Sequence, residues 1–126
     1  MTHYSRLARI VIDAPSETHD AEVTFWRAAT GVPLQRYERF PAFHGAPPGP
    51  DCMGLLLQLL GDGPAGVHVD IHTNDRAAEV ARLIGLGATV VDESQPWTIL
   101  RDPAGLLFCV VPDETVNESN AHTWST

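Results

Sequence analysis

Apolar and polar side chains alternate along residues 66–73, which read GVHVDIHT. Because successive side chains of a β-strand point to opposite faces, this pattern predicts a strand with one apolar face and one polar face. The apolar set is Val67, Val69 and Ile71, and the polar set is His68, Asp70 and His72. We expect the apolar set to pack against the helix that follows. The polar set then lines a partly enclosed concave face, or it forms an ordinary solvated or hydrogen-bonded strand face.

Runs rich in β-branched and other apolar residues predict the remaining strands. These runs are residues 7–14, 52–60, 88–93, 97–102 and 106–112, with a further short strand within residues 33–40. Segments dense in turn residues separate several of them, such as GDGPAG after residue 60. The chain therefore alternates between strands and the two helical segments described next.

Two segments carry the start and stop signals of amphipathic helices. The first, residues 19–30, follows Ser16 or Thr18 as its cap and ends before Gly31. Its predicted buried face consists of Ala21, Phe25 and Ala29, with Trp26 beside them. The second follows Thr73 or Asn74 as its cap and ends near Gly87. Its predicted buried face consists of Ala77, Val80, Ala81 and Ile84.

The elements occur twice in the order strand, helix and three strands, at a period of about 60 residues. This repeat predicts an α+β fold in which two βαβββ modules form a cupped mixed sheet. We place one domain at residues 1–112, with module one at about residues 6–60 and module two at about residues 66–112. Residues 113–126 have little apolar periodicity, so we predict a mobile tail in which Trp124 is the candidate anchor.

The composition argues against several classes of partner. The chain has 126 residues and a formal net charge of -8, and it contains no lysine. Nucleic acids and anionic membranes require clustered basic residues. No apolar run approaches the roughly 20 residues that span a bilayer, and no secretory signal is visible. Cys52 and Cys109 show neither a disulfide framework nor a CxxC pattern. We therefore expect a cytoplasmic protein without nucleic-acid or membrane partners.

Polar side chains within apolar strands are the candidate functional residues. His68 and Asp70 stand about 7 Å apart along one strand face, so they can share a water, a substrate proton or a metal ion. Gln58 interrupts an apolar run, where its amide costs more than a methyl group, and this indicates a hydrogen-bond partner or a ligand. The other candidates are Trp26, Trp97 and Cys109. For these three the simplest interpretation is a buried core or cavity-wall residue.

Several motifs together resemble a known family. They are the histidine-bearing strand before an Asn-Asp helix start, LIGLGATVV after that helix, WTILRDPAG and the closing strand. FWRAATGVPL is the corresponding part of the first half. These motifs resemble the glyoxalase-like and bleomycin resistance branch of the vicinal oxygen chelate superfamily. The resemblance implies two βαβββ modules, commonly in a homodimer, with a pocket that holds a divalent metal in many relatives.

Compared residue by residue, the resemblance supports one metal ligand. His68 falls on the family's histidine ligand, whereas Cys109 stands where a glutamate is usual. The ligand of the opening strand falls near Arg9 or Val11, and an arginine has no lone pair to donate. We therefore predict no cofactor and no stoichiometric metal. The alternative is a divalent metal at His68, including a zinc site that combines a histidine or Asp70 with Cys109.

Two classes of function make specific predictions, and a third, a structural or regulatory partner module, also remains open. The first is a protein that binds a small molecule of unknown identity in a dimer-associated pocket and needs no catalytic group. The second is an enzyme of the lyase, isomerase or dioxygenase type. In it, His68 binds a metal or acts as a general base, with Asp70 orienting it and Gln58 polarising the substrate. We favour the binding protein. Its predicted ligand contacts are Gln58, His68, Asp70, Trp26, Trp97 and Cys109.

Overall fold

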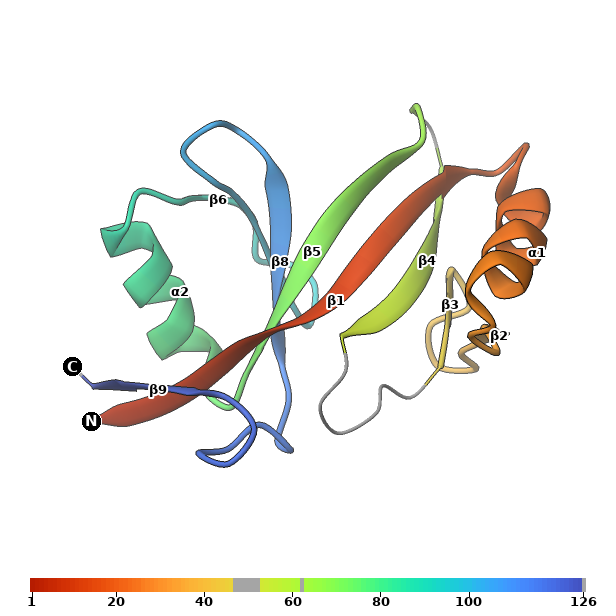
Figure 1. Cartoon of the computed structure of the whole chain (residues 1–126). Coiled ribbons are helices and arrows are strands. Elements are labelled where there is room, and N and C mark those ends of the chain that lie inside the picture. Colours follow the sequence, from red (N-terminus) through yellow and green to blue (C-terminus); the bar gives the residue numbers. More distant parts are fainter. Residues whose placement is uncertain (47–52, 62, 126) are drawn as a thin grey trace. The chain divides into compact units, whose positions relative to one another are not determined.

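The twofold order of strand, helix and three strands is present in the structure. The computed structural model describes residues 1–46, 53–61 and 63–125 (Figure 1), and the predicted strand start at Cys52 lies outside them. The first half comprises β1 (Thr2–Pro15), α1 (His19–Thr30), β2 (Gln35–Arg36), β3 (Phe43–Gly45) and β4 (Gly54–Leu60). The second half comprises β5 (Gly66–Thr73), α2 (Arg76–Gly85), β6 (Thr89–Asp92), β7 (Thr98–Arg101) and β8 (Leu107–Pro112), and β9 (His122–Ser125) follows.

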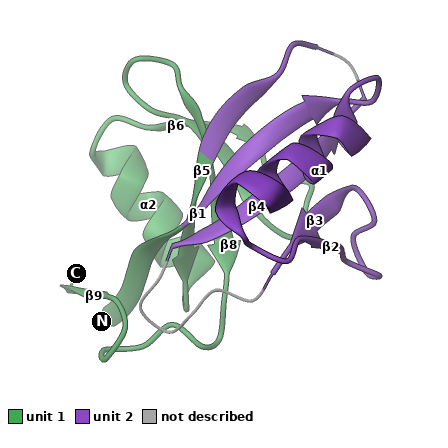
Figure 2. Cartoon of the chain, turned by 45° about the vertical axis from the view of Figure 1, so that its right-hand side comes forward, with its two compact units in different colours: residues 1–8, 69–126 green, residues 9–68 purple. Residues whose placement is uncertain are grey.

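The chain divides into two compact units (Figure 2). Unit 1 consists of Met1–Ala8 and Val69–Thr126, and unit 2 of Arg9–His68. These bounds differ from the predicted modules at about residues 6–60 and 66–112. The physical reason is the length of β1 and β5, because each of these strands contributes one part to each unit.

Unit 2 is a small sheet covered by α1. Its strand order is β2-β3-β4-β1, with β1 parallel to β4 from Arg9↔Gly54 to Pro15↔Leu60. Strand β3 runs antiparallel to β4. The core between the sheet and α1 is the buried cluster Ile12, Val23, Leu34 and Leu57. Burial of this cluster is the main stabilising term for the unit.

Helix α1 has the predicted bounds but buries a different face. The predicted face of Ala21, Phe25 and Ala29 is exposed. Val23 and His19 are buried instead, and Trp26 packs against the core cluster. The physical reason is that the face carrying Val23 packs on the core cluster of the sheet, although the face with Phe25 has more apolar residues. Phe25 remains 59% exposed. Gly31 ends the helix with φ 75, the left-handed conformation that glycine adopts without strain.

Unit 1 holds the second sheet, in the order β9-β1-β5-β8-β7-β6. Strand β5 is parallel to β8, while β7 runs antiparallel to both β8 and β6. The core cluster is Val80, Ala88, Leu100, Phe108 and Val110. Val69 and Ile71 pack against it, as the alternation of β5 predicts. Val67, the first residue of that apolar set, belongs to unit 2 and is 66% exposed.

Helix α2 also differs from the prediction in its cap and its buried face. Asp75, rather than Thr73 or Asn74, is the N-cap residue, and its side chain accepts a hydrogen bond from the Ala78 backbone N–H at 3.0 Å. Within the predicted face, Val80 is the buried residue. The predicted residues Ala77, Ala81 and Ile84 are exposed, and Glu79 and Leu83 face the interior instead. The buried face of α2 is therefore narrower than predicted, and it includes the charged residue Glu79.

The C-terminal segment, predicted as a mobile tail, contains strand β9. It pairs antiparallel with β1 from Thr2↔Ser125 to Ser5↔His122 (Figure 1). The Trp124 indole N–H donates to Ser5 Oγ at 2.8 Å, and its ring lies 3.8 Å from the guanidinium carbon of Arg82. The backbone pairing and one aromatic anchor order this segment without apolar periodicity. None of the described helices combines the length and the apolar character needed to cross a membrane.

Candidate functional site

The parallel pair β1 and β4 brings two polar side chains together in unit 2. Asp13 and Gln58 are direct cross-strand partners, and such partners point to the same face of a sheet. Their neighbours Ile12 and Leu57 belong to the core beneath α1. Asp13 and Gln58 therefore lie on the sheet face opposite α1.

His68 joins this pair through a short hydrogen bond. Its Nδ1 lies 2.7 Å from Asp13 Oδ2, and the two side chains are 12% and 17% exposed. With the proton on Nδ1, the imidazole donates to the carboxylate, which holds the ring in one orientation and one tautomer. The other oxygen of Asp13, Oδ1, is buried and has no hydrogen-bond partner among the described residues. A buried acceptor without a partner is costly, so it is a place where a ligand donor is favoured.

Asp13 was not among the residues that the sequence singled out. The position expected to matter on the first strand was Arg9 or Val11, which leave the same face of β1 as Asp13 by alternation. A usable signal was present. Asp13 is a carboxylate within the apolar run LARIVIDA. Burying a carboxylate costs more than burying the amide of Gln58, so Asp13 needs a partner even more than Gln58 does.

Unit 1 brings Asp70 and Cys109 together on the strand face opposite α2. They are cross-strand partners in the parallel pair β5 and β8, and their potential ligand atoms lie within 4.8 Å of each other. Asp70 is 5% exposed. The neighbours of Cys109 on β8, Phe108 and Val110, point into the core, so the thiol faces away from it. Asp70 also follows His68 by two residues on β5, and both therefore leave the same face of that strand.

His72, the last polar residue of the β5 alternation, has a carboxylate partner of its own. Its Nδ1 lies 2.8 Å from Asp113 Oδ2. Asp113 also accepts hydrogen bonds from the Thr115 backbone N–H at 2.9 Å and from Thr115 Oγ1 at 2.6 Å. Partial burial raises the pKa of Asp113, but the hydrogen bonds from Thr115 and His72 outweigh burial and leave the pKa below its usual value. Asp113 is therefore a carboxylate at neutral pH.

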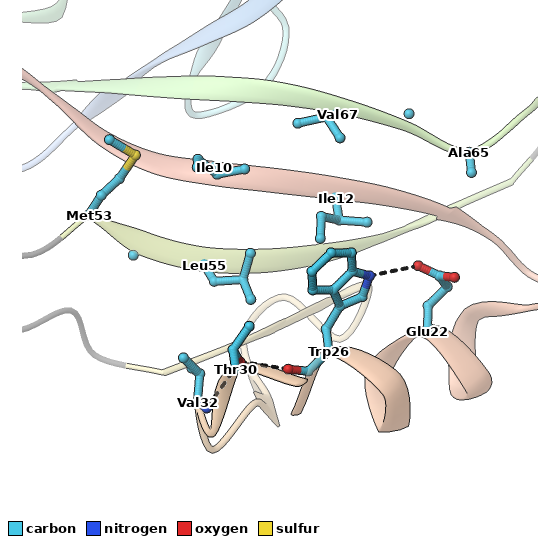
Figure 3. Close-up of a pocket in the computed structure, with 12 residues that line it drawn as sticks. Ile10, Ile12, Glu22, Trp26, Thr30, Val32, Met53, Leu55, Ala65 and Val67 are labelled. Carbon is cyan, nitrogen blue, oxygen red and sulfur yellow. Dashed lines mark hydrogen bonds between the residues drawn. The ribbon is translucent and has the colours of Figure 1, made fainter. Parts of the chain in front are cut away.

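Trp26 does not join the residues around Asp13. Trp26 lines an apolar pocket on the α1 side of the unit 2 sheet (Figure 3). Neither Gln58 nor His68 lines that pocket. Trp97 lies in unit 1, is partly exposed and directly precedes β7. Trp26 is thus separated from the polar group by the thickness of the sheet.

The glyoxalase-like domain family is matched over residues 9–111. This protein belongs to the glyoxalase-like family. The match covers most of both repeats and confirms membership of the vicinal oxygen chelate superfamily. No curated protein matches this glyoxalase-like chain.

Solved structures show the same α+β fold at low sequence identity. A variant of the methylmalonyl-CoA epimerase of Streptomyces coelicolor, in complex with 2-nitronate-propionyl-CoA, is 22% identical with a TM-score of 0.58, over 91% of this chain and 99% of that one. A hypothetical protein of Bacillus halodurans has 17% identity and a TM-score of 0.64, over 90% and 98%. The Mn(II)-bound glyoxalase of Novosphingobium aromaticivorans has 17% identity and a TM-score of 0.59, over 93% of this chain and 42% of that one.

The donor atoms of this glyoxalase-like protein can be tested against a divalent metal within each unit. In unit 2, one oxygen of Asp13 is already hydrogen-bonded to His68, and Gln58 adds an amide. In unit 1, Asp70 and Cys109 supply one carboxylate and one thiol. A tight site needs about three or four protein ligands. Among the described residues, the unit 1 set is too small for such a site, and the unit 2 carboxylate and imidazole are already joined to each other by a hydrogen bond.

Proposed function

We propose that this glyoxalase-like protein binds a small molecule at the unit 2 face where Asp13, Gln58 and His68 meet. The observation that carries the proposal is the 2.7 Å contact between His68 and Asp13, beside a second carboxylate oxygen that is buried without a partner. A ligand hydroxyl or N–H would satisfy that oxygen. We also propose that the protein forms a homodimer and that it is cytoplasmic.

The donor and acceptor types indicate a ligand that carries a carbonyl group. The Gln58 amide N–H can donate to a carbonyl oxygen, while Asp13 accepts from a neighbouring hydroxyl or N–H. Two of the methylmalonyl-CoA epimerase structures among the neighbours contain methylmalonyl-CoA and 2-nitronate-propionyl-CoA. We therefore propose an acyl thioester, or a related carbonyl compound, as the ligand class to test first.

A second candidate function is proton transfer at the carbon next to that carbonyl. In this mechanism His68 removes the carbon-bound proton and later returns one to the same carbon. Asp13 keeps the imidazole in the required tautomer and stabilises the imidazolium that forms, as a carboxylate partner does in other acid–base sites. The Gln58 amide donates to the developing enolate oxygen. When His68 alone moves the proton, the proton returns to the face that it left, so this mechanism predicts exchange of the α-proton with solvent. An epimer forms only if a second acid protonates the opposite face of the enolate.

We expect His68→Asn to weaken the binding of an acyl-CoA ester about tenfold, because the variant removes the imidazole and leaves Asp13 without its partner. Isothermal titration with methylmalonyl-CoA measures this. If His68 is also a general base, the exchange of the substrate's α-proton in D₂O, followed by NMR, falls by about 10²- to 10⁴-fold.

The matched control is His122→Asn, because His122 is exposed on β9. Asp13→Asn keeps the shape of the partner and removes its charge, so it should affect exchange more than binding. Unchanged affinity in both His68→Asn and Asp13→Asn would exclude this face as the binding site. Binding without any exchange would leave the binding protein as the function.

A separate prediction concerns metal. We expect protein purified without added metal to contain well under one equivalent of zinc, nickel, manganese or iron. Among the described residues, unit 1 offers one carboxylate and one thiol, and the carboxylate and imidazole of unit 2 are hydrogen-bonded to each other. Elemental analysis by mass spectrometry measures this. About one equivalent per chain that is lost in His68→Ala would contradict the prediction.

A further inference from the structure

An apolar pocket of about 640 Å³ lies in unit 2 on the α1 side of the sheet (Figure 3). Its walls come from α1, β1, β4 and the start of β5. Ile10 and Ile12 of β1 point into it, so the alternating residues Val11 and Asp13 point to the other face. The pocket is therefore separate from the polar group around His68.

The pocket leaves apolar side chains uncovered. Val67 is 66% exposed, Met53 48% and Ile10 40%, and all three line the pocket together with Leu55 and Trp26. A volume of this size lies within the usual range for small-molecule sites. Covering the exposed apolar surface with an apolar ligand is favourable in proportion to the area removed from water. The walls therefore favour a ligand with an apolar body.

The charge at one end of the pocket restricts the ligand further. Glu22 is the one charged side chain among the 12 residues drawn in Figure 3. The Trp26 indole N–H donates to Glu22 Oε2 at 3.0 Å, which holds the ring beside the carboxylate. The other Glu22 oxygen has no hydrogen-bond partner within the described part of the chain. An aromatic ring next to a carboxylate attracts organic cations through the ring face and the negative charge.

We propose that this pocket is a second binding site, and that its ligand is a hydrophobic organic cation. The apolar body of the ligand lies against Ile10, Leu55 and Val67, and its cationic group lies at Trp26 and Glu22. An anion of the same shape is repelled by Glu22 and by the net charge of -8. Charge complementarity thus selects the ligand class, while the apolar walls supply most of the affinity.

Tetraphenylphosphonium and tetraphenylborate test this proposal, because they share one shape and carry opposite charges. We expect one phosphonium ion per chain, bound at least about tenfold more tightly than the borate. Glu22→Gln should weaken phosphonium binding about threefold and leave borate binding unchanged or stronger. Trp26→Leu should weaken phosphonium binding about tenfold. Isothermal titration measures the affinities, and the melting temperature of each variant shows that it is folded.

The matched control is Glu17→Gln, which removes the same charge from an exposed residue just before α1 that does not line the pocket. His68→Asn should also leave phosphonium binding unchanged, which separates this site from the one proposed above. Equal loss in Glu17→Gln and Glu22→Gln would reduce the preference to net charge and overturn the proposal. Equal affinity for the two ions would overturn it too. So would a stable dimer that buries Val67 and excludes both probes.

Discussion

Glu79→Ala is expected to lower the free energy of unfolding by about 4 kcal/mol, since breaking a buried ion pair leaves its partners uncompensated. Glu79 is 0% exposed. Its Oε1 lies 2.8 Å from both His3 Nε2 and Arg82 Nε, and its Oε2 accepts from Arg82 Nη2 at 2.9 Å. Arg82 also stacks on Trp124, so the same carboxylate supports the docking of β9. Urea denaturation followed by circular dichroism measures the loss.

Two comparison variants make the cause identifiable. Glu79→Gln keeps the side-chain volume and loses the charge, so we expect a smaller loss of about 2 kcal/mol. Glu114→Ala removes an exposed carboxylate and should change stability by less than about 0.5 kcal/mol. If Glu79→Ala were no more destabilising than Glu114→Ala, the buried network would contribute nothing to stability.

The same carboxylate predicts an acid limb in the stability profile. Burial raises the pKa of Glu79, but hydrogen bonds from Arg82, Ser5 and His3 outweigh burial and lower it from 4.5 to about 2. A group whose folded pKa is lowered stabilises the protein above its unfolded pKa. That contribution, roughly 3 kcal/mol, is lost as the pH falls from about 4.5 to about 2. Glu79→Gln should lack this part of the pH dependence.

Leu57→Ala is expected to cost about 3 kcal/mol, because the substitution leaves a cavity in the core of unit 2. Leu57 is 0% exposed and packs with Ile12, Val23 and Leu34 beneath α1. Leu107→Ala is the matched control, since Leu107 is 44% exposed on β8, and it should cost less than about 1 kcal/mol. Equal costs for the two substitutions in urea denaturation would contradict the assigned core.

The secondary structure followed well from local pattern. The alternation of β5 and the capping and glycine signals of α1 depend on residues close together in the chain, so the sequence is sufficient to predict them. The buried faces of the helices were less predictable. On α1 Val23 is buried while Phe25 is exposed, and on α2 the charged residue Glu79 is buried. Which stripe of a helix is buried depends on the strands beneath it, and a helical wheel does not contain that information.

The candidate site divides in the same way. The selection of His68, Gln58 and Asp70 required only that polar residues in apolar strands have partners, and the face shared by His68 and Asp70 follows from the strand period. The partner of His68 could not be predicted from the sequence in this way. Asp13 is 55 residues from His68 in sequence, and no local pattern specifies which carboxylate a strand register brings next to a histidine.

The sequence by itself determined the repeat of strand, helix and three strands, the family, and the two-faced character of β5. These properties depend on side-chain alternation and on turn and capping residues within a few positions of each other. Only the tertiary structure decided that Asp13 orients His68, that Trp26 lies on the opposite sheet face, and that β9 pairs with β1. Each of these depends on strand register and on packing between segments that are distant in the sequence. Local sequence does not fix the register of a strand pair; the burial of one face of the sheet does.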